Sequence, residues 1–262
     1  MSHVNILDEY VHAAPSDQTA LDLFKGEWSS IFPATTQLTA TPGNAPLFED
    51  GRIAWVAEKF GFFGKSVLEL GPLEGGHSYM AQMRGARRVL AIEANARAYV
   101  KCLIVKEIFN LDRVSFKLGD FNAYLSETKE KFDICIASGV LYHCVDPIST
   151  IANIARVSDN VFFWTHHYDA NVIQNSPNLK KFFTSPETTV TVNGVTYPAR
   201  QKHYNDALGW QGFCGGSQPH ALWISKAAIL DSLKTHGFKS FSIEFEQMDH
   251  PNGPAFAVCA SR

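Results

Sequence analysis

Acidic residues and glycines meet where an apolar run gives way to a helical pattern. Residues 65–70 carry alternating apolar and β-branched side chains around Glu69, and Gly71, Gly75 and Gly76 follow before helical spacing begins. This order predicts a strand, a tight loop and a helix. Because glycines let a backbone approach a ligand and a helix start offers N–H groups, the stretch predicts a nucleotide cradle. Similar turns also bind dinucleotides or phosphates, or bind nothing.

The charge of Glu69 narrows the choice of ligand. A dinucleotide carries an anionic pyrophosphate, which a carboxylate two residues before Gly71 would repel. A cationic sulfonium or ammonium group would instead be attracted. The sequence therefore favours a ligand with a positive charge near this loop.

Two further acids end predicted strands. Glu93 closes the strand predicted over 88–92, where a carboxylate can accept hydrogen bonds from both ribose hydroxyls. The alternative is an ordinary exposed acid at a strand end. Asp120 follows the strand predicted over 114–118 and is either a ligand-binding acid or a plain helix cap.

Imidazoles follow the next two predicted strands. His143 lies in the loop after 132–137, and His166 ends the strand predicted over 160–165. Either can act as a general base, since imidazole titrates near neutral pH; the alternative is a structural histidine bonded to the backbone. Together with His220 and His250 they lack the paired spacing of a metal site, so no metal is expected.

The glycine loop resembles the first motif of class I S-adenosylmethionine-dependent methyltransferases, in which an acid precedes a glycine-rich turn. Leu73 stands where that family usually has its middle glycine. The resemblance covers roughly residues 50 to 170 and implies S-adenosylmethionine as the cofactor. The residues that it assigns to cofactor binding are Glu69, Gly71, Leu73, Gly75, Glu93, Ala94, Asp120, Phe121, Ser138 and Gly139.

The resemblance also implies what these residues hold. Glu69 and the Gly71 region would hold the methionine end, Glu93 the ribose, and Asp120 with Phe121 the adenine. The run from Gly139 to His143 is similar, more narrowly, to the Gly-Val-Leu-Tyr-His run of bacterial enzymes that modify the wobble uridine of transfer RNA. By this resemblance Tyr142, His143 and His166 are the candidates for the reacting centre.

Strands alternating with helices must position these residues. The alternation predicts an α/β fold with a parallel sheet covered on both faces. The resemblance implies that this sheet is Rossmann-like, with seven mostly parallel strands and an antiparallel pair over 241–247 and 255–260 at one edge. We expect an N-terminal cover segment over 1–49 and a methyltransferase domain over 50–262. A helix is expected over 18–30, and the connection up to Pro46 is either a surface linker or a cover in which Trp28 and Phe48 pack over the cofactor.

An irregular stretch from about 168 to 220 interrupts the alternation. Asn193 and Gly194 predict a two-residue turn between β-forming residues 188–197. Long excursions of this kind usually act as lids or substrate walls, so we expect a lid with few buried contacts. Residues 209–216 supply Trp210 and Phe213 to a mobile wall.

Composition limits the remaining possibilities. The chain has 262 residues, 45% of them hydrophobic, and a formal charge of −3. This suits one domain, and the absence of basic runs argues against a nucleic-acid surface. The scattered cysteines and the lack of a membrane-length apolar stretch predict a cytoplasmic protein without a membrane segment. The five cysteines are Cys102, Cys135, Cys144, Cys214 and Cys259.

These features together predict a methyltransferase that acts on a hydroxyl, or less readily a nitrogen, of a small molecule such as a sugar or secondary metabolite. The side chains expected to face the acceptor are aromatic or imidazole and hardly any is cationic, which favours a largely uncharged acceptor. They are Trp28, Tyr142, His143, His166, Tyr168, Trp210 and His220. The alternatives are an enzyme that modifies the wobble uridine of transfer RNA and an inactive regulatory subunit. The sequence indicates no oligomeric state.

Overall fold

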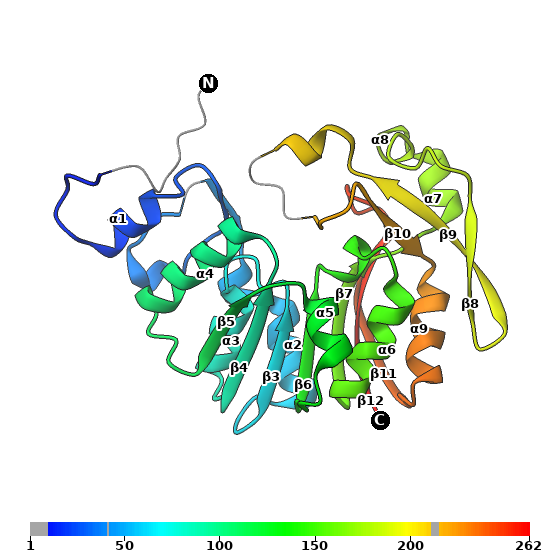
Figure 1. Ribbon diagram of the computed structural model, residues 1–262, viewed down its shortest axis with the longest axis horizontal. Helices are drawn as coiled ribbons and strands as arrows, with labels where there is room; N and C mark the ends of the chain where they lie inside the picture. Colours follow the sequence, from blue (N-terminus) through cyan, green and yellow to red (C-terminus); the bar gives the residue numbers. More distant parts are fainter. Residues whose placement is uncertain (1–9, 41, 211–214) are drawn as a thin grey trace.

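The computed structural model describes residues 10–40, 42–210 and 215–262, and a seven-stranded sheet in the order β11-β12-β7-β6-β3-β4-β5 forms its centre (Figure 1). Strands β7, β6, β3, β4 and β5 run parallel, whereas β12 pairs antiparallel with β7 and β11. The predicted fold class is therefore confirmed. The strands are β3 (Ser66–Leu70), β4 (Arg88–Glu93), β5 (Val114–Leu118), β6 (Ile134–Ser138), β7 (Asn160–His166), β11 (Ser240–Gln247) and β12 (Ala255–Ser261).

Helices cover both faces of the sheet. Buried side chains of α2, α3 and α4 share one core with Val67 and Phe162, and those of α5, α6 and α9 share the other with Leu68 and Phe163. The helices are α2 (Gly51–Phe60), α3 (Gly76–Met83), α4 (Ala96–Ile108), α5 (Phe121–Glu127), α6 (Pro147–Val157) and α9 (Lys226–Thr235). The result is a three-layer α/β arrangement.

The central strand β3 is buried along its whole length. Its side chains alternate between the two cores, with Val67 on one side and Leu68 and Leu70 on the other. A strand covered on both faces can be apolar throughout. Glu69 is therefore an exception, because a buried carboxylate needs partners.

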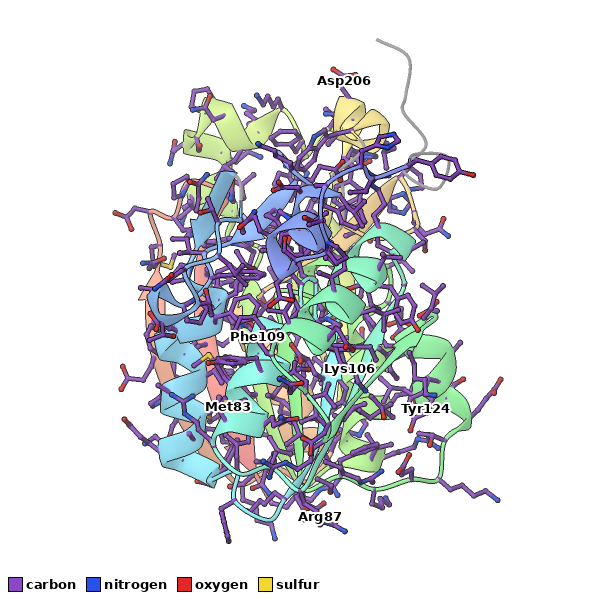
Figure 2. All side chains as sticks on the ribbon, turned by 90° about the vertical axis from the view of Figure 1, so that its left-hand side faces the viewer. Met83, Arg87, Lys106, Phe109, Tyr124 and Asp206 are labelled. Atoms are coloured by element: carbon purple, nitrogen blue, oxygen red, sulfur yellow. The ribbon has the colours of Figure 1, made fainter. Side chains whose placement is uncertain are left out.

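The chain reverses direction across the sheet between β3 and β6, which lie side by side. From β3 it proceeds to β4 and β5, and then it returns to β6 and β7 on the other side. Ligands of open parallel sheets bind at such a switch point, outside the carboxyl ends of the strands. Figure 2 shows the two edges of the sheet, with Arg87 before β4 at the lower one and Asp206 near the upper one.

The N-terminal segment packs against α3 and α4. Trp28 and Phe48 are both buried, so a surface linker is the wrong reading; Phe32 packs against both rings. The helix expected over 18–30 is also wrong in its second half, because Gly26 at φ 91° ends the helical path and an extended strand follows. The elements are α1 (Asp17–Asp22), β1 (Trp28–Ser30), η2 (Ala34–Thr36), β2 (Pro42–Ala45) and η3 (Leu47–Glu49).

The insertion after β7 lies at the upper right of Figure 1. The predicted hairpin is confirmed, with Asn193 and Gly194 at φ 48° and 79° as a two-residue turn requires. Its elements are α7 (Ala170–Asn175), α8 (Pro177–Lys180), β8 (Thr188–Val192), β9 (Val195–His203) and η5 (Asn205–Gly209), and β10 (His220–Ile224) pairs with β9.

The insertion has a small core of its own, which includes Tyr168, Ile173, Phe183 and Tyr204. The expectation that it buries few side chains is therefore wrong. The residues of this core are mostly large and are scattered through an irregular stretch, so they show no periodicity from which the core could be predicted. A lid function stays a prediction. Within the described ranges, none of the helices combines the length and apolar character needed to span a membrane.

Candidate functional site

The loop after β3 contacts the loop after β6 at the switch point. Gly71 has a φ of 64°, and a β-carbon on it would lie 2.6 Å from Cγ1 of Val140. Gly75 has a φ of 80°, and a β-carbon there would lie 2.9 Å from Cζ of Phe116. Both positions require glycine for conformation and for space. The two loops therefore form adjoining walls of one site.

Leu73 has a φ of 56°, in the left-handed region that glycine adopts without strain. Its N–H donates to Oε2 of Glu93 at 3.1 Å, and its carbonyl accepts from the Cys102 thiol at 3.6 Å. The departure from the usual glycine thus changes the side chain but keeps the turn. The bonds to Glu93 and Cys102 hold the strained backbone in place.

Glu93 is only 7% exposed, so it is not an ordinary exposed acid. Its Oε1 accepts from the Asn95 N–H at 2.8 Å, and its Oε2 accepts from Leu73. Burial raises the pKa of Glu93 despite these bonds, and the charge of Glu69 raises it further. Each carboxylate oxygen can accept a second hydrogen bond, so hydroxyl donors of a ligand suit this position.

Glu69 lies behind the loop. It is 2% exposed and accepts from the hydroxyl of Ser78 on α3, while Nδ1 of His77 lies 3.8 Å from its Oε1. Burial raises the pKa of Glu69, against the lowering effects of His77 and Ser78. The carboxylate contacts α3 and not the open side of the loop, so it acts on a ligand through its field.

Negative charge dominates the surroundings of this loop. Burial is the largest cause of the raised pKa of the Cys102 thiol. The charges of Glu93, Glu69 and Glu74 raise this pKa further, and the charge of Lys101 lowers it. Such a field favours a cationic ligand and disfavours a pyrophosphate. Lys101 neutralises Glu74, so Glu69 and Glu93 are the acids that contribute most to this field. The preference for a cationic ligand stays a prediction.

The remaining residues assigned to cofactor binding lie at neighbouring strand ends. Asp120 is exposed and caps α5 through a bond from the Asn122 N–H to its Oδ1 at 2.7 Å, as the alternative reading had it. Phe121 is partly buried against the core, and Ala94 is exposed. Ser138 ends β6, and Gly139 donates its N–H to the Trp164 carbonyl at 2.8 Å. All therefore lie at the carboxyl edge of the sheet.

Aromatic and imidazole rings gather beside Gly139. The centroids of the Tyr142 and His143 rings, on η4 (Leu141–His143), lie 4.2 Å apart, and that of His166 lies 4.7 Å from Tyr142. A β-carbon on Gly139 would lie 3.6 Å from the Tyr142 hydroxyl oxygen. Burial raises the pKa of Tyr142 to about 12, so its hydroxyl stays protonated at neutral pH. The predicted reacting residues are thus brought together, and we call Tyr142, His143, His166 and Trp223 the ring cluster.

The hydrogen bonds of both histidines leave Nε2 as the acceptor nitrogen. Nδ1 of His166 lies 2.8 Å from the Gly253 carbonyl and must donate to it. The Tyr204 hydroxyl donates to the Gly215 carbonyl at 2.5 Å, so its oxygen accepts from Nδ1 of His143 at 2.7 Å. In the neutral imidazole the other nitrogen then carries a lone pair. Each ring is therefore held in the tautomer that a general base requires.

Burial lowers the pKa of both imidazoles, to about 3 for His143 and about 4 for His166. Both are therefore neutral at physiological pH. They differ in access, because His166 is 4% exposed and stacks on Trp223 with ring centroids 5.3 Å apart, whereas His143 is only partly buried. An incoming hydroxyl reaches His143 more easily.

Other side chains expected to face the acceptor lie elsewhere. Trp28 is buried under the N-terminal segment, and Tyr168 donates to a glutamate within the insertion. Trp210 is 65% exposed, and His220 packs beside another histidine of the β9–β10 pair. Phe213 lies outside the described residues. The expected acceptor wall is thus smaller than predicted.

An ionic link that the sequence did not reveal runs from α3 to the ring cluster. Arg52 binds Asp50 with Nη2 and Oδ2 2.6 Å apart, and Nε2 of His77 lies 2.9 Å from the same oxygen. Burial opposes them, but the hydrogen bonds of His77 and Arg52 hold the pKa of Asp50 well below its usual value. The Arg52 guanidinium lies 4.5 Å from the centroid of Trp164, whose ring is 6.1 Å from that of Tyr142.

The expectation of a site almost without cations is wrong. Besides Arg52, the ammonium of Lys202 borders the ring cluster, 4.9 Å from the centroid of the Trp223 ring. Lys202 lies on β9 in the insertion, and β9 pairs with the strand that carries Trp223. This strand pairing was not predicted from the sequence, so Lys202 was not expected beside the ring cluster.

Glu74 joins the glycine loop to the N-terminal segment. Its carboxylate is 0% exposed, accepts from the N–H groups of Ser29 and Ser30 at 3.0 and 2.8 Å, and pairs with Nζ of Lys101 at 3.0 Å. A charge so deeply buried must be neutralised and hydrogen-bonded. Glu74 therefore fixes the segment over 1–49 to the loop.

We expect Glu74→Gln to lower the free energy of unfolding by about 3 kcal/mol, because it leaves the buried ammonium of Lys101 without its counter-charge. Urea unfolding measures the change, and proteolysis should cut the N-terminal segment faster. The matched control is Glu107→Gln, an exposed acid on the same helix as Lys101. Equal unfolding midpoints for Glu74→Gln and Glu107→Gln would refute this role.

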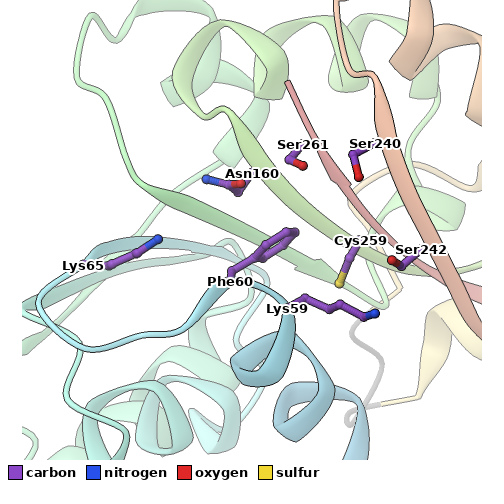
Figure 3. A pocket seen from close by; sticks show the side chains of 8 residues that line it. All are labelled: Lys59, Phe60, Lys65, Asn160, Ser240, Ser242, Cys259 and Ser261. Carbon is purple, nitrogen blue, oxygen red and sulfur yellow. The ribbon is translucent and has the colours of Figure 1, made fainter.

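A cavity of about 210 Å³ lies at the opposite edge of the sheet (Figure 3). Its lining includes Lys65 before β3, Asn160 at the start of β7 and Ser261 at the end of β12. These are the amino ends of the parallel strands, away from the glycine loop. The cavity is therefore separate from the candidate site. In the described part of the chain, no group of three or more His, Cys, Asp or Glu side chains is placed to hold a metal.

Comparisons with known proteins agree with the observed fold. Residues 63–209 match a family model described as a methyltransferase domain. The N-terminal domain of EvdMO1, crystallised in the presence of SAH and D-fucose, is similar in structure, with 20% identity, a TM-score of 0.64 and coverage of 94% of this chain and 93% of that one. The magnesium protoporphyrin IX methyltransferase ChlM of Synechocystis PCC 6803, with bound SAH, shows 14% identity, a TM-score of 0.52 and 80% coverage of each chain. No curated protein sequence matches the chain.

Proposed function

Because the chain belongs to the family of methyltransferase domains, we propose that it transfers the methyl group of S-adenosylmethionine to a hydroxyl of a small molecule. The observation that carries the proposal is the position of Tyr142 and His143 beside Gly139, in the loop that adjoins Gly71 at the switch point. The proposed donor site and a candidate general base therefore lie at the same edge of the sheet. Nitrogen acceptors are the second choice, because a base that takes up a proton suits a hydroxyl.

The residues present fit the cofactor. The carboxylate of Glu93 can accept further hydrogen bonds from hydroxyl donors, and the charges of Glu69 and Glu93 suit a positively charged group. We assign the ribose to Glu93, the methionine end to the loop from Gly71 to Gly75, and the adenine to Asp120 and Phe121. Leu73, Ala94, Ser138 and Gly139 complete the walls. When bound, S-adenosylmethionine supplies a methyl group attached to a positively charged sulfur.

His143 then has the role of general base. Its Nδ1–H is directed to Tyr204, so Nε2 can take the proton of the acceptor hydroxyl. The Tyr142 hydroxyl, which stays protonated, can donate to the acceptor oxygen and orient it. His166, nine-tenths buried and held by Gly253, supports the wall on which the acceptor rests. No covalent intermediate with the protein is required.

The side chains of the ring cluster indicate which class of acceptor fits. The rings of Tyr142 and His143 are partly exposed and can contact the sugar or aromatic ring of a ligand, whereas His166 and Trp223 are buried and support Tyr142. The presence of D-fucose with the similar EvdMO1 domain supports a sugar as the first candidate. The acceptor is therefore proposed to be a sugar or an aromatic secondary metabolite that carries a hydroxyl.

The test uses S-adenosylmethionine with a deuterated methyl group. We expect the purified protein to place the label on a small hydroxyl compound from a panel of sugars, phenols and hydroxy acids, detected by mass spectrometry. Bulk transfer RNA is the second arm, at low and physiological salt, because the run from Gly139 to His143 resembles that of wobble-uridine enzymes. Label in the RNA, with steep salt dependence, would contradict the proposal in favour of that alternative. Cofactor binding without any transfer would favour a regulatory subunit.

A further inference from the structure

Lys202 lies beside the ring cluster, and its positive charge has no role in the methyl transfer proposed above. Its Nζ lies 4.9 Å from the centroid of Trp223 and 5.8 Å from that of Phe182, and the side chain is partly buried. Trp223 in turn stacks on His166 with an angle of 4° between the rings. The ammonium therefore lies against the aromatic wall of the ring cluster and not in open solvent.

Within the described ranges, no carboxylate forms an ion pair or hydrogen bond with Lys202. Lys101, a buried lysine, is by contrast neutralised by Glu74, with Nζ and Oε1 3.0 Å apart. The acids of the insertion have other contacts or locations: Glu187 accepts from a tyrosine, Asp169 caps α7, and Asp206 is exposed in η5. Removing an ammonium partly from water without a counter-ion costs free energy. An anion that binds beside Lys202 would offset this cost.

Arg52 is not available to bind an anion in the same way. Its guanidinium reaches the cluster over Trp164, but it already forms a bidentate ion pair with Asp50. Lys202 is therefore the cation at the cluster with uncompensated charge among the described residues.

The charge of Lys202 also reaches the proposed base. Burial is the largest cause of the lowered pKa of His143, and the charge of Lys202 is the second largest. The same charge contributes to the lowered pKa of His166. An anion beside Lys202 would cancel this effect. The imidazole of His143 would then hold a proton more strongly, as a general base requires.

We propose that the methyl acceptor carries an anionic group, a carboxylate or a phosphate, and that Lys202 binds this group beside the Trp223 ring. The inference rests on the proposed function and narrows its substrate class. It replaces the largely uncharged acceptor that the sequence suggested. A hydroxyl compound with an acidic group, such as a uronic acid, a sugar phosphate or a hydroxybenzoate, meets Lys202, the rings and His143 together.

The test compares isosteric acids and amides bound to the protein saturated with SAH, the demethylated cofactor. The pairs are 4-hydroxybenzoate with 4-hydroxybenzamide and glucuronate with glucuronamide, and glucose 6-phosphate with glucose separates phosphate from carboxylate. The indole N–H of Trp223, which donates to the Tyr142 carbonyl at 3.0 Å, reports binding by nitrogen-15 NMR and is assigned with Trp223→Phe. Ionic strength is held constant, because salt screens such contacts.

We expect the Trp223 signal to saturate at an about tenfold lower concentration of at least one anion than of its neutral partner. Lys202→Met should remove the preference and Lys202→Arg should keep it. The matched control is Lys181→Met, because Lys181 is an exposed lysine of the insertion that lies 5.1 Å from the centroid of Phe182, a ring that Lys202 also contacts, and the proposal depends on the further contact of Lys202 with Trp223. Lys181→Met should leave the preference unchanged.

Equal affinity for acid and amide in every pair, an unchanged preference in Lys202→Met, or no saturable shift with any anion would each overturn the inference. Calorimetry of SAH with the same samples keeps the two proposals apart. SAH that binds while anions show no preference leaves the methyltransferase proposal standing and removes only the role of Lys202. SAH that does not bind refutes the proposed function itself.

Discussion

Replacing His143 with glutamine is expected to lower kcat by about 100- to 10,000-fold, because the acceptor hydroxyl then loses the group that takes its proton. Glutamine keeps the length and a hydrogen bond to Tyr204 but has no basic nitrogen. The rate is measured with the acceptor found by the deuterated-methyl assay. Affinity for SAH should stay within about twofold of wild type, since His143 is assigned to the acceptor side.

Two histidine variants provide the controls. His166→Gln removes a buried ring that stacks on Trp223, and it should raise KM more than it lowers kcat, as expected for a wall residue. His220→Gln on β10 changes a partly buried ring that packs beside His203, and it should leave both constants unchanged. A kcat of His143→Gln equal to that of His220→Gln would refute the role of His143 as base.

The pH profile adds an independent check of the same role. With a folded-state pKa of about 3, His143 is protonated only in strong acid, so the neutral form required of a base prevails above about pH 5. The value of kcat/KM, which reports the free enzyme, should therefore not fall between pH 8 and pH 5.5 on account of this group. An acid limb near pH 6.5 that disappears in His143→Gln would show an unshifted imidazole and contradict the buried geometry.

Local sequence signals predicted the fold and the turn after β3 well. Gly71 and Gly75 were identified because a strand, a tight turn and a helix follow one another within a few residues, and both need a left-handed backbone. Glu93 was identified because parallel strands end at a common edge, so a single acid at a strand end could be placed. The assignments to ribose and adenine stay predictions.

The acceptor side was predictable only in part. His143 lies in the loop that follows β6 and His166 ends β7, so both could be inferred, but Lys202 reaches the cluster through the pairing of β9 with β10, which no local pattern indicates. Arg52 approaches Trp164 from a helix more than one hundred residues earlier in the chain. Contacts of this kind depend on tertiary packing, which propensity and spacing do not encode.

The second large effect concerns the cofactor. We expect Glu93→Ala to weaken SAH binding by about 2–4 kcal/mol, that is about 30- to 1,000-fold, because two hydrogen bonds to a charged acceptor are lost. Glu93 also accepts from the N–H groups of Leu73 and Asn95, so a structural effect must be separated from ligand contact. A 2′-deoxy analogue of SAH does this. It should bind more weakly than SAH to wild type but equally to Glu93→Ala.

An exposed acid provides the matched control for this variant. Glu127→Ala, at the exposed end of α5, should bind SAH as wild type does. If Glu93→Ala still distinguished SAH from its 2′-deoxy analogue by the wild-type factor, the assignment of the ribose to Glu93 would be wrong.

Calorimetric titration of the wild-type protein with SAH, and in parallel with NAD, tests the central claim most directly. The assignment of the ribose to Glu93 predicts that SAH binds at one site per chain, with a dissociation constant of about 10 μM or lower. The acids around the loop from Gly71 to Gly75 disfavour a pyrophosphate, so NAD should give no saturable heat. Saturable binding of NAD together with no binding of SAH would contradict the claim that this switch point is the donor site of a methyltransferase.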